Sequence, residues 1–164
     1  MKDLKHVTIY TDGACIGNPG PGGYGVVLIY EGRRKELSGG YRMTTNNRME
    51  IMAATVALEA LKKRCRVTLY SDSQYLVRAM SQGWAKRWQA KGWMRNRRER
   101  ALNADLWETL LQLCDHHEVD FRWVKGHARS PENLRCDELA MQAAQQKDLP
   151  ADYGYERMLQ FPAA

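Results

Sequence analysis

The 164-residue sequence has no apolar run near the roughly 20 residues that a membrane-spanning helix requires. Its opening segment, Met1–His6, lacks the apolar core of a secretory signal peptide, which predicts a cytoplasmic protein with no membrane partner. The 4 cysteines are widely separated and include no Cys-x-x-Cys pair, so we expect reduced, mostly buried thiols instead of disulfides or a zinc site. Because internal repeats and linkers are also missing, we expect one domain over residues 1–146 and a polar, partly disordered tail over 147–164.

Positive charge exceeds negative charge, with 25 Lys and Arg against 19 Asp and Glu. That balance alone excludes little, because many basic proteins bind no nucleic acid. Its distribution is more informative, since much of the excess lies between Trp84 and Arg100, where Glu99 is the single acid. Such a patch is the electrostatic footprint of a protein that binds a phosphate backbone.

The pattern of apolar residues and turn residues predicts an α/β fold. Strands are expected at 7–11, 24–30, 35–41, 67–70 and 119–124. Helices are expected over about 46–63, 74–80, 104–113 and 131–145. The first three strands form an antiparallel meander, and the crossover helix after them predicts that the third and fourth strands run parallel. The expected architecture is a five-stranded mixed sheet, three antiparallel strands and then two parallel ones, flanked by helices.

Four acidic residues occupy positions that favour a shared site. Asp12 ends the first expected strand and Asp72 follows the fourth, and ligands of α/β proteins collect where adjacent central strands end. Glu50 lies about one turn into the first long helix, and Asp137 about two turns into the last. Any one of them could be a solvated or salt-bridged surface acid. Four clustered carboxylates, however, raise one another's pKa or recruit a cation.

The type of ligand indicates the metal and the chemistry. Hard oxygen ligands without a set of His or Cys residues favour Mg²⁺, or Mn²⁺ in its place, over zinc. Divalent ions held in this way assist displacement at phosphorus, one activating water and another stabilising the leaving oxygen. The four acids therefore predict a metal site that hydrolyses a phosphodiester backbone.

The glycine-rich segment 17–23 could suggest a phosphate-binding loop, but its context excludes that interpretation. It leads into an expected strand instead of a helix, and no Gly-Lys-Ser/Thr follows it. We interpret these glycines as residues that permit the positive φ angles of a tight β connection.

Five motifs, in order along the chain, resemble those of bacterial type 1 ribonucleases H. They are YTDGACIGNPGPGGY at 10–24, TTNNRME at 44–50, SDSQY at 71–75, WVKGH at 123–127 and PENLRCDELA at 131–140. The resemblance runs from about Val7 to Ala144 and implies a ribonuclease H-like fold. It also implies endonucleolytic cleavage of the RNA strand of RNA–DNA hybrids, leaving 5′-phosphate and 3′-hydroxyl ends. The metal-binding catalytic acids it implies are Asp12, Glu50, Asp72 and Asp137.

The resemblance further implies a set of auxiliary and substrate-binding residues. His127 takes the position of a mobile-loop histidine that assists proton transfer or product departure. Residues implied to bind the hybrid near its minor groove are Gly13, Cys15, Asn18, Asn46, Asn47 and Gln74, and this shallow groove displays the 2′-hydroxyls of the RNA. Thr45 and Asn103 match a pocket that grips the phosphates of the DNA strand.

The Trp-rich basic segment from Trp84 to Arg100 resembles the family's basic protrusion. The candidate substrate contacts within it are Trp84, Lys86, Arg87, Trp88 and Lys91, and we expect Trp88 and Trp107 to pack partly into the core. The family resemblance also implies a monomer, and it suggests a contact with a single-stranded-DNA-binding protein.

Two other functions remain open at this point. A resolvase or integrase-type DNA nuclease has a related fold, but lacks this combination of Asn-Asn-Arg-Met-Glu and Gly-His motifs. A non-catalytic module that binds hybrids would retain the shape, although four intact acids argue against it. A requirement for 2′-hydroxyl groups would separate the first of these from a ribonuclease H.

Overall fold

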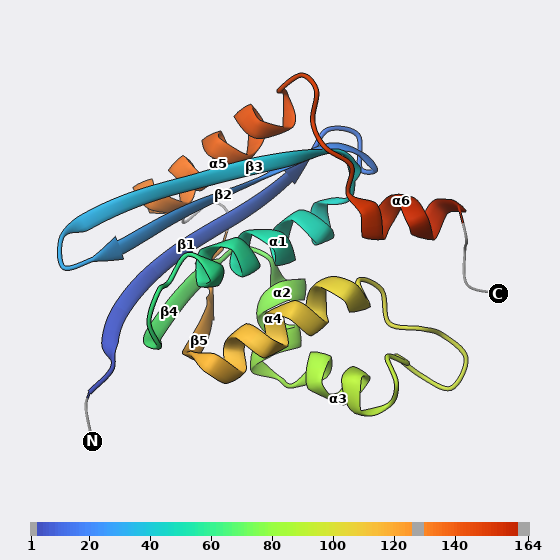
Figure 1. The fold of residues 1–164 in the computed structure, drawn as a ribbon, viewed down its shortest axis with the longest axis horizontal. Coiled ribbons are helices and arrows are strands. Elements are labelled where there is room, and N and C mark those ends of the chain that lie inside the picture. The colour runs from blue at the N-terminus through green and yellow to red at the C-terminus, as the bar shows by residue number, and fades with distance from the viewer. Residues whose placement is uncertain (1–2, 126–129, 161–164) are drawn as a thin grey trace.

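A computed structural model describes residues 3–125 and 130–160 (Figure 1). The strands are β1 (Lys5–Cys15), β2 (Gly20–Tyr30), β3 (Arg33–Thr44), β4 (Cys65–Ser71) and β5 (Glu118–Trp123). The helices are α1 (Asn46–Glu59), α2 (Gln74–Ser81), α3 (Trp84–Ala90), α4 (Ala104–His116), α5 (Pro131–Ala144) and α6 (Tyr153–Gln160). In the part of the chain described here, no helix is long and apolar enough to cross a membrane.

The strands form one sheet in the order β3-β2-β1-β4-β5. β2 pairs antiparallel with both β1 and β3, whereas β4 pairs parallel with both β1 and β5. This confirms the predicted mixed sheet of three antiparallel and two parallel strands. β3 and β4 do run in the same direction, as predicted, but β2 and β1 lie between them.

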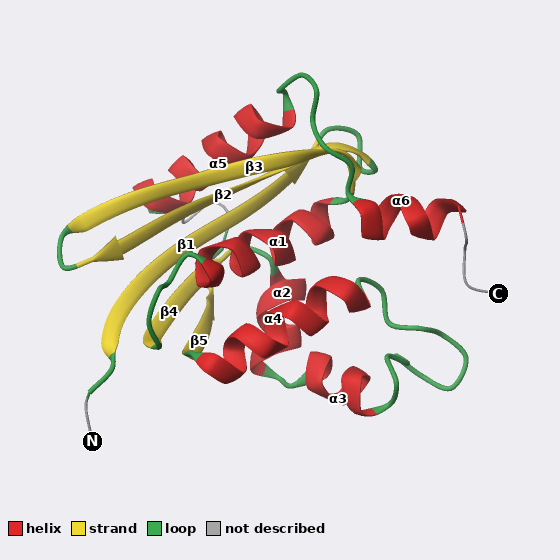
Figure 2. Ribbon diagram, viewed as in Figure 1, coloured by secondary structure: helices red, strands yellow, loops and turns green. Residues whose placement is uncertain are grey.

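Helices cover both faces of the sheet (Figure 2). α5 lies on one face, and α1 lies on the other, where α2 packs beside it on β4 and β5, α4 packs against α1, and α3 contacts α2 and α4. Successive side chains of a strand point to opposite faces. Accordingly Val26 belongs to the large core under α1, whereas Val27 packs in a smaller cluster with Cys136 and Leu139 of α5. The sheet is therefore buried on both sides around β1 and β2.

Helix α1 is buried on more sides than its apolar stripe indicated. The helical spacing of Met49, Met52, Ala53, Val56 and Ala60 predicts one apolar stripe, but Met52 and Val56 are only partly buried. Glu50, Ala54 and Ala57, expected beside the stripe, are buried. The reason is that α1 lies between the sheet and α4, so two of its faces are covered.

The C-terminal segment, for which the sequence predicts partial disorder, makes hydrogen bonds or ion pairs at Pro150, Asp152 and Glu156. It folds back to the end of β3 and continues as α6, with Asp152 and Tyr155 buried. Sequence periodicity could not indicate these contacts, because Thr44 and Arg48, which bond to Asp152, are more than 100 residues earlier in the chain. The boundary between domain and tail at 146 stays a prediction.

Candidate active site

The register of the sheet brings Asp12 and Asp72 together. The parallel ladder between β1 and β4 ends with the pair Tyr10 and Tyr70, whose rings stack at 5.2 Å. Asp12 and Asp72 each follow that pair by two residues, so they lie side by side where β1 and β4 diverge. Asp12 is 6% exposed, and its Oδ1 accepts a hydrogen bond of 2.9 Å from the backbone N–H of Gly13.

Glu50 reaches the same point from helix α1. The Thr45 hydroxyl caps that helix by accepting from the N–H of Arg48 at 3.2 Å, and Glu50 follows one turn later. A Cβ at position 13 would lie 2.5 Å from the backbone nitrogen of Glu50, which real side chains do not tolerate. Gly13 therefore lets the first turn of α1 lie directly on β1, and this approach buries Glu50 beside Asp12.

Asp137 is brought to the site by the close packing of α5 on β2. Side chains at Gly23 and Gly25 would collide with carbonyl oxygens of α5, so these glycines permit direct contact between helix and strand. Next to Asp137, the Cys136 thiol donates to the carbonyl oxygen of Tyr10 at 3.2 Å. This hydrogen bond fixes α5 against the part of β1 that leads into Asp12.

The acids line one groove of about 530 Å³. Asp12, Glu50 and Asp72 each offer a carboxylate oxygen, and these three oxygens lie within 4.8 Å of one another. Asp137 lines the same groove and its negative charge acts on Asp12. Three of the acids therefore lie close together, and Asp137 lines the groove beside them.

Burial and mutual repulsion change the acidity of this cluster. Burial, with the neighbouring charge of Asp72, raises the pKa of Asp12 to about 7. Burial and the charge of Asp12 also raise the pKa of Glu50 well above its usual value. Both shifts mean that the protein alone does not stabilise the full negative charge of the cluster.

The residues present suit a hard divalent cation. Glu50 Oε1 is buried, and among residues 3–125 and 130–160 it has no hydrogen-bond partner. A buried carboxylate oxygen without a partner is costly unless a cation compensates it. The thiol of nearby Cys15 instead faces two backbone carbonyl oxygens, those of Gly20 and Thr44, at 3.4 and 3.5 Å. The ligand set is therefore carboxylate oxygen, which favours magnesium-like ions over zinc.

Comparison with known proteins gives the family. Residues 4–145 match the RNase H family model, which is most of the chain. The chain belongs to the ribonuclease H family. The resemblance to bacterial type 1 ribonucleases H is confirmed, and these enzymes are metal-dependent endonucleases that hydrolyse the RNA strand of RNA–DNA hybrids.

Curated relatives match this ribonuclease H over nearly their full length. It is 65% identical to "Ribonuclease H" of Desulforamulus reducens, over 92% of this chain and 94% of that protein. It is 60% identical to "Ribonuclease HI" of Synechocystis sp., over 91% and 94%. Among solved structures, LC9-RNase H1, a type 1 RNase H with the type 2 active-site motif, is 33% identical with a TM-score of 0.78, over 96% of this chain and 82% of that one.

The implied substrate-binding residues of the ribonuclease H fall into two regions. Those that line the groove with the acids are Gly13, Cys15, Asn46, Asn47 and Gln74. Asn18 lies beside it, because its side-chain oxygen accepts from the N–H of Asn46 at 3.0 Å. Thr45 and Asn103 cap α1 and α4 respectively. His127 lies outside the described residues.

The second region is helix α3 and the residue after it. Trp84 and Trp88 pack together at 6.5 Å, and Trp88 also contacts the fully buried Trp107 at 6.2 Å. The tryptophans therefore attach α3 to the core, and Trp88 is partly buried, as expected. Lys86, Arg87 and Lys91, the basic candidates of this region, are exposed.

Tyr75 is a residue of the groove that sequence reasoning did not single out. Its hydroxyl oxygen accepts from Asn103 Nδ2 and from Trp107 Nε1, both at 3.2 Å. The available signal was its place in the SDSQY motif, three residues after Asp72. Tyr75 thereby links the groove to the start of α4.

Proposed function

We propose that this chain cleaves the RNA strand of RNA–DNA hybrids in the groove that Asp12, Glu50, Asp72 and Asp137 line. The observation that carries the proposal is a groove in which Asp12, Asp72 and Asp137 lie beside a buried oxygen of Glu50 that has no hydrogen-bond partner among the residues described. The four carboxylates would hold Mg²⁺, with Mn²⁺ as a substitute. When bound, such ions activate water and stabilise the leaving oxygen, which leaves 5′-phosphate and 3′-hydroxyl ends.

The groove residues would recognise the hybrid by its shape and its 2′-hydroxyls. Asn46, Asn47 and Gln74 offer amides, and the backbone at Gly13 allows close approach. Such donors and acceptors suit the wide, shallow minor groove of an A-like duplex. In support, LC11-RNase H1 was solved in complex with RNA/DNA hybrid, and this chain is 28% identical to it with a TM-score of 0.66, over 84% of this chain and 96% of that one. We propose that His127 assists proton transfer or product departure.

The test is one cleavage assay with three labelled duplexes. RNA–DNA hybrid, duplex DNA and duplex RNA are each incubated with Mg²⁺, with Mn²⁺ and with chelator. We expect cleavage of the hybrid and not of duplex DNA, because a site built to bind a 2′-hydroxyl discriminates by about 10⁴-fold against a substrate without it. Equal cutting of hybrid and duplex DNA would instead indicate a DNA nuclease of related fold. Binding of hybrid without any cleavage would indicate a non-catalytic module.

The exposed lysines of the α3 region would contact phosphates beyond the groove. We expect Lys86→Ala/Lys91→Ala to raise KM for the hybrid and leave kcat nearly unchanged. Each lost phosphate contact should make the slope of log affinity against log salt shallower by about one. Arg87 is left intact because its guanidinium donates to the carbonyl oxygen of Gln82 at 3.0 Å and so supports the fold.

The matched control is Lys35→Ala/Lys63→Ala, which removes the same charge from exposed positions outside both regions. Its salt slope should match that of the unchanged protein. Equal weakening by the two double variants would mean that overall charge, and not the α3 region, binds the hybrid.

We also propose, on the family resemblance, that the protein is a cytoplasmic monomer of one domain over 1–146 and that it contacts a single-stranded-DNA-binding protein.

A separate groove of about 630 Å³ supports the proposed contact with a single-stranded-DNA-binding protein. Its lining includes apolar side chains such as Leu28 and Leu61, and its cations are Lys5, Arg33, Arg34, Lys35, Lys62 and Lys63. A partner segment that carried both acidic and apolar side chains would be complementary to it.

A further inference from the structure

Arg48 is a buried cation close to the acids that the proposed chemistry does not use. It is 3% exposed and precedes Glu50 by two residues in α1. A buried guanidinium is tolerated only when its donors are satisfied. Its Nε and Nη2 donate to the carboxylate of Asp152 at 2.7 and 2.9 Å, and its Nη1 and Nη2 donate to that of Asp105 at 2.9 and 2.7 Å. Arg48 thus joins α1 to α4 and to the C-terminal segment.

Asp152 also holds the end of β3. Its Oδ2 accepts from the Thr44 hydroxyl at 2.6 Å, and the backbone N–H of Arg42 donates to the Pro150 carbonyl oxygen at 2.9 Å. Thr44 directly precedes Thr45 and Asn46, so the C-terminal segment is attached where the substrate-binding end of α1 begins. A side chain at Gly154 would collide with Asp105, and the glycine therefore allows the segment to cover the ion pairs.

On its other side Arg48 orients the amide of Asn103. Its Nη1 donates to Asn103 Oδ1 at 3.4 Å, and the Nδ2 of the same amide donates to the Tyr75 hydroxyl at 3.2 Å. A cation facing the amide oxygen directs the NH₂ group toward Tyr75, which lines the groove. A continuous set of hydrogen bonds therefore runs from Asp152 through Arg48 and Asn103 to the groove.

We propose that Arg48 and Asp152 are positioning residues for substrate binding, through which the C-terminal segment Pro150–Tyr155 holds Thr45, Asn46 and Asn103 in place. They would not touch the substrate themselves, and the inference rests on the proposed hybrid-cleaving function. Glu50 should depend on them less, because Gly13 and β1 hold its part of α1 independently. Loss of Arg48 or Asp152 should therefore change the affinity for the hybrid more than the rate at which bound hybrid is cleaved.

The test is Asp152→Asn, which keeps the size of the side chain but removes the charge that Arg48 faces. We expect KM for the hybrid to rise about tenfold, since small misplacements of binding groups are costly, while kcat changes less than about threefold. Arg48→Lys should act in the same direction, because an ammonium group cannot make two forked pairs. Both are assayed at a temperature at which circular dichroism shows them fully folded. Should Asp152→Asn fail to fold, Thr44→Val tests the same attachment by removing one hydrogen bond to Asp152.

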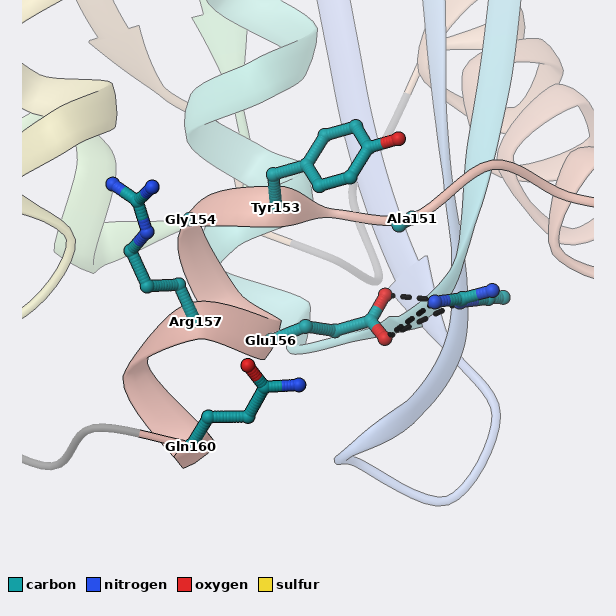
Figure 3. A pocket seen from close by; sticks show the side chains of 7 residues that line it. Ala151, Tyr153, Gly154, Glu156, Arg157 and Gln160 are labelled. Atoms are coloured by element: carbon teal, nitrogen blue, oxygen red, sulfur yellow. Dashed lines mark hydrogen bonds and ion pairs between the residues drawn. The ribbon is translucent and has the colours of Figure 1, made fainter.

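The matched control is Glu156→Gln. It breaks the exposed ion pair with Arg42, at 2.9 Å, that also fixes the C-terminal segment and that is drawn dashed in Figure 3. Glu156 lines a separate pocket of about 550 Å³ beside α6, so its loss should leave KM unchanged. A normal KM for Asp152→Asn, or equal effects of Asp152→Asn and Glu156→Gln, would overturn the inference. Failure of the unchanged protein to cut hybrid in the same assay would instead overturn the proposed function.

Discussion

Asp12→Asn is expected to reduce hybrid cleavage by about 10³-fold or more, while hybrid binding changes only a few-fold. The amide keeps the size of the carboxylate and can still accept from the Gly13 N–H, so the local fold should persist. It cannot supply the negative oxygen that lies within 4.8 Å of those of Glu50 and Asp72. Single-turnover cleavage measures the chemical step, and fluorescence anisotropy with labelled hybrid measures binding.

The same variant should be more stable than the unchanged protein when metal is absent. The folded state raises the pKa of Asp12 from 3.8 to about 7, so the folded state binds the proton more tightly than the unfolded state does. The stability that this proton contributes is fully present at pH values below the pKa of Asp12 in the unfolded state. It is lost as pH rises through the pKa of Asp12 in the folded state. At pH 8 with chelator, Asp12→Asn should therefore raise the free energy of unfolding by on the order of 4 kcal/mol.

Urea unfolding at several pH values provides the check. The increase in the free energy of unfolding that Asp12→Asn causes should be small near pH 3, where Asp12 is protonated in both the folded and the unfolded state. It should grow as pH rises to about 7. Asp120→Asn is the control, because Asp120 is an exposed acid on β5 that pairs with Arg122. Normal turnover of Asp12→Asn, or lower stability than the unchanged protein at pH 8, would remove Asp12 from the proposed cluster.

The sequence allowed the acids to be identified, but it did not show how each is held. Asp12 and Asp72 could be predicted because both follow apolar strands, and the parallel register of β1 and β4 then places them together. Sequence periodicity places Glu50 beside the single apolar stripe of its helix, whereas Glu50 is buried because α1 is covered by both the sheet and α4. The collision that a side chain at Gly13 would cause is a tertiary contact, and no local pattern reveals it.

Element order could be predicted better than element length. β1 extends beyond its predicted end to Cys15, and β2 begins at Gly20, inside the glycine-rich segment 17–23, because pairing with a neighbouring strand outweighs the weak strand preference of glycine. The contacts of the C-terminal segment could not be predicted from the sequence. Its order comes from Asp152, which contacts Thr44 and Arg48 across more than 100 positions of sequence. The polar composition of this segment favours disorder, because composition alone does not show that a polar side chain has a buried ion-pair partner elsewhere in the chain.

Removal of divalent metal is expected to abolish hybrid cleavage, and the affinity for Mg²⁺ should increase as pH rises toward 7. A metal ligand must be ionised, and burial beside Asp72 raises the pKa of Asp12 to about 7. Below that value each bound metal must displace a proton, so the apparent affinity should fall by up to about tenfold per pH unit for each proton displaced. Above it, the contribution of Asp12 to this pH dependence should level off.

Calorimetric titration with Mg²⁺ in two buffers of different ionisation enthalpy counts the protons released. We expect more release at pH 6.5 than at pH 8, and we expect Asp12→Asn to release fewer protons at pH 6.5 than the unchanged protein does. Restoring Mg²⁺ after chelation should restore cleavage, which separates loss of metal from loss of fold. A metal affinity independent of pH between 6 and 8 would show that the acids are already ionised without metal, and that burial does not hold the proton on Asp12.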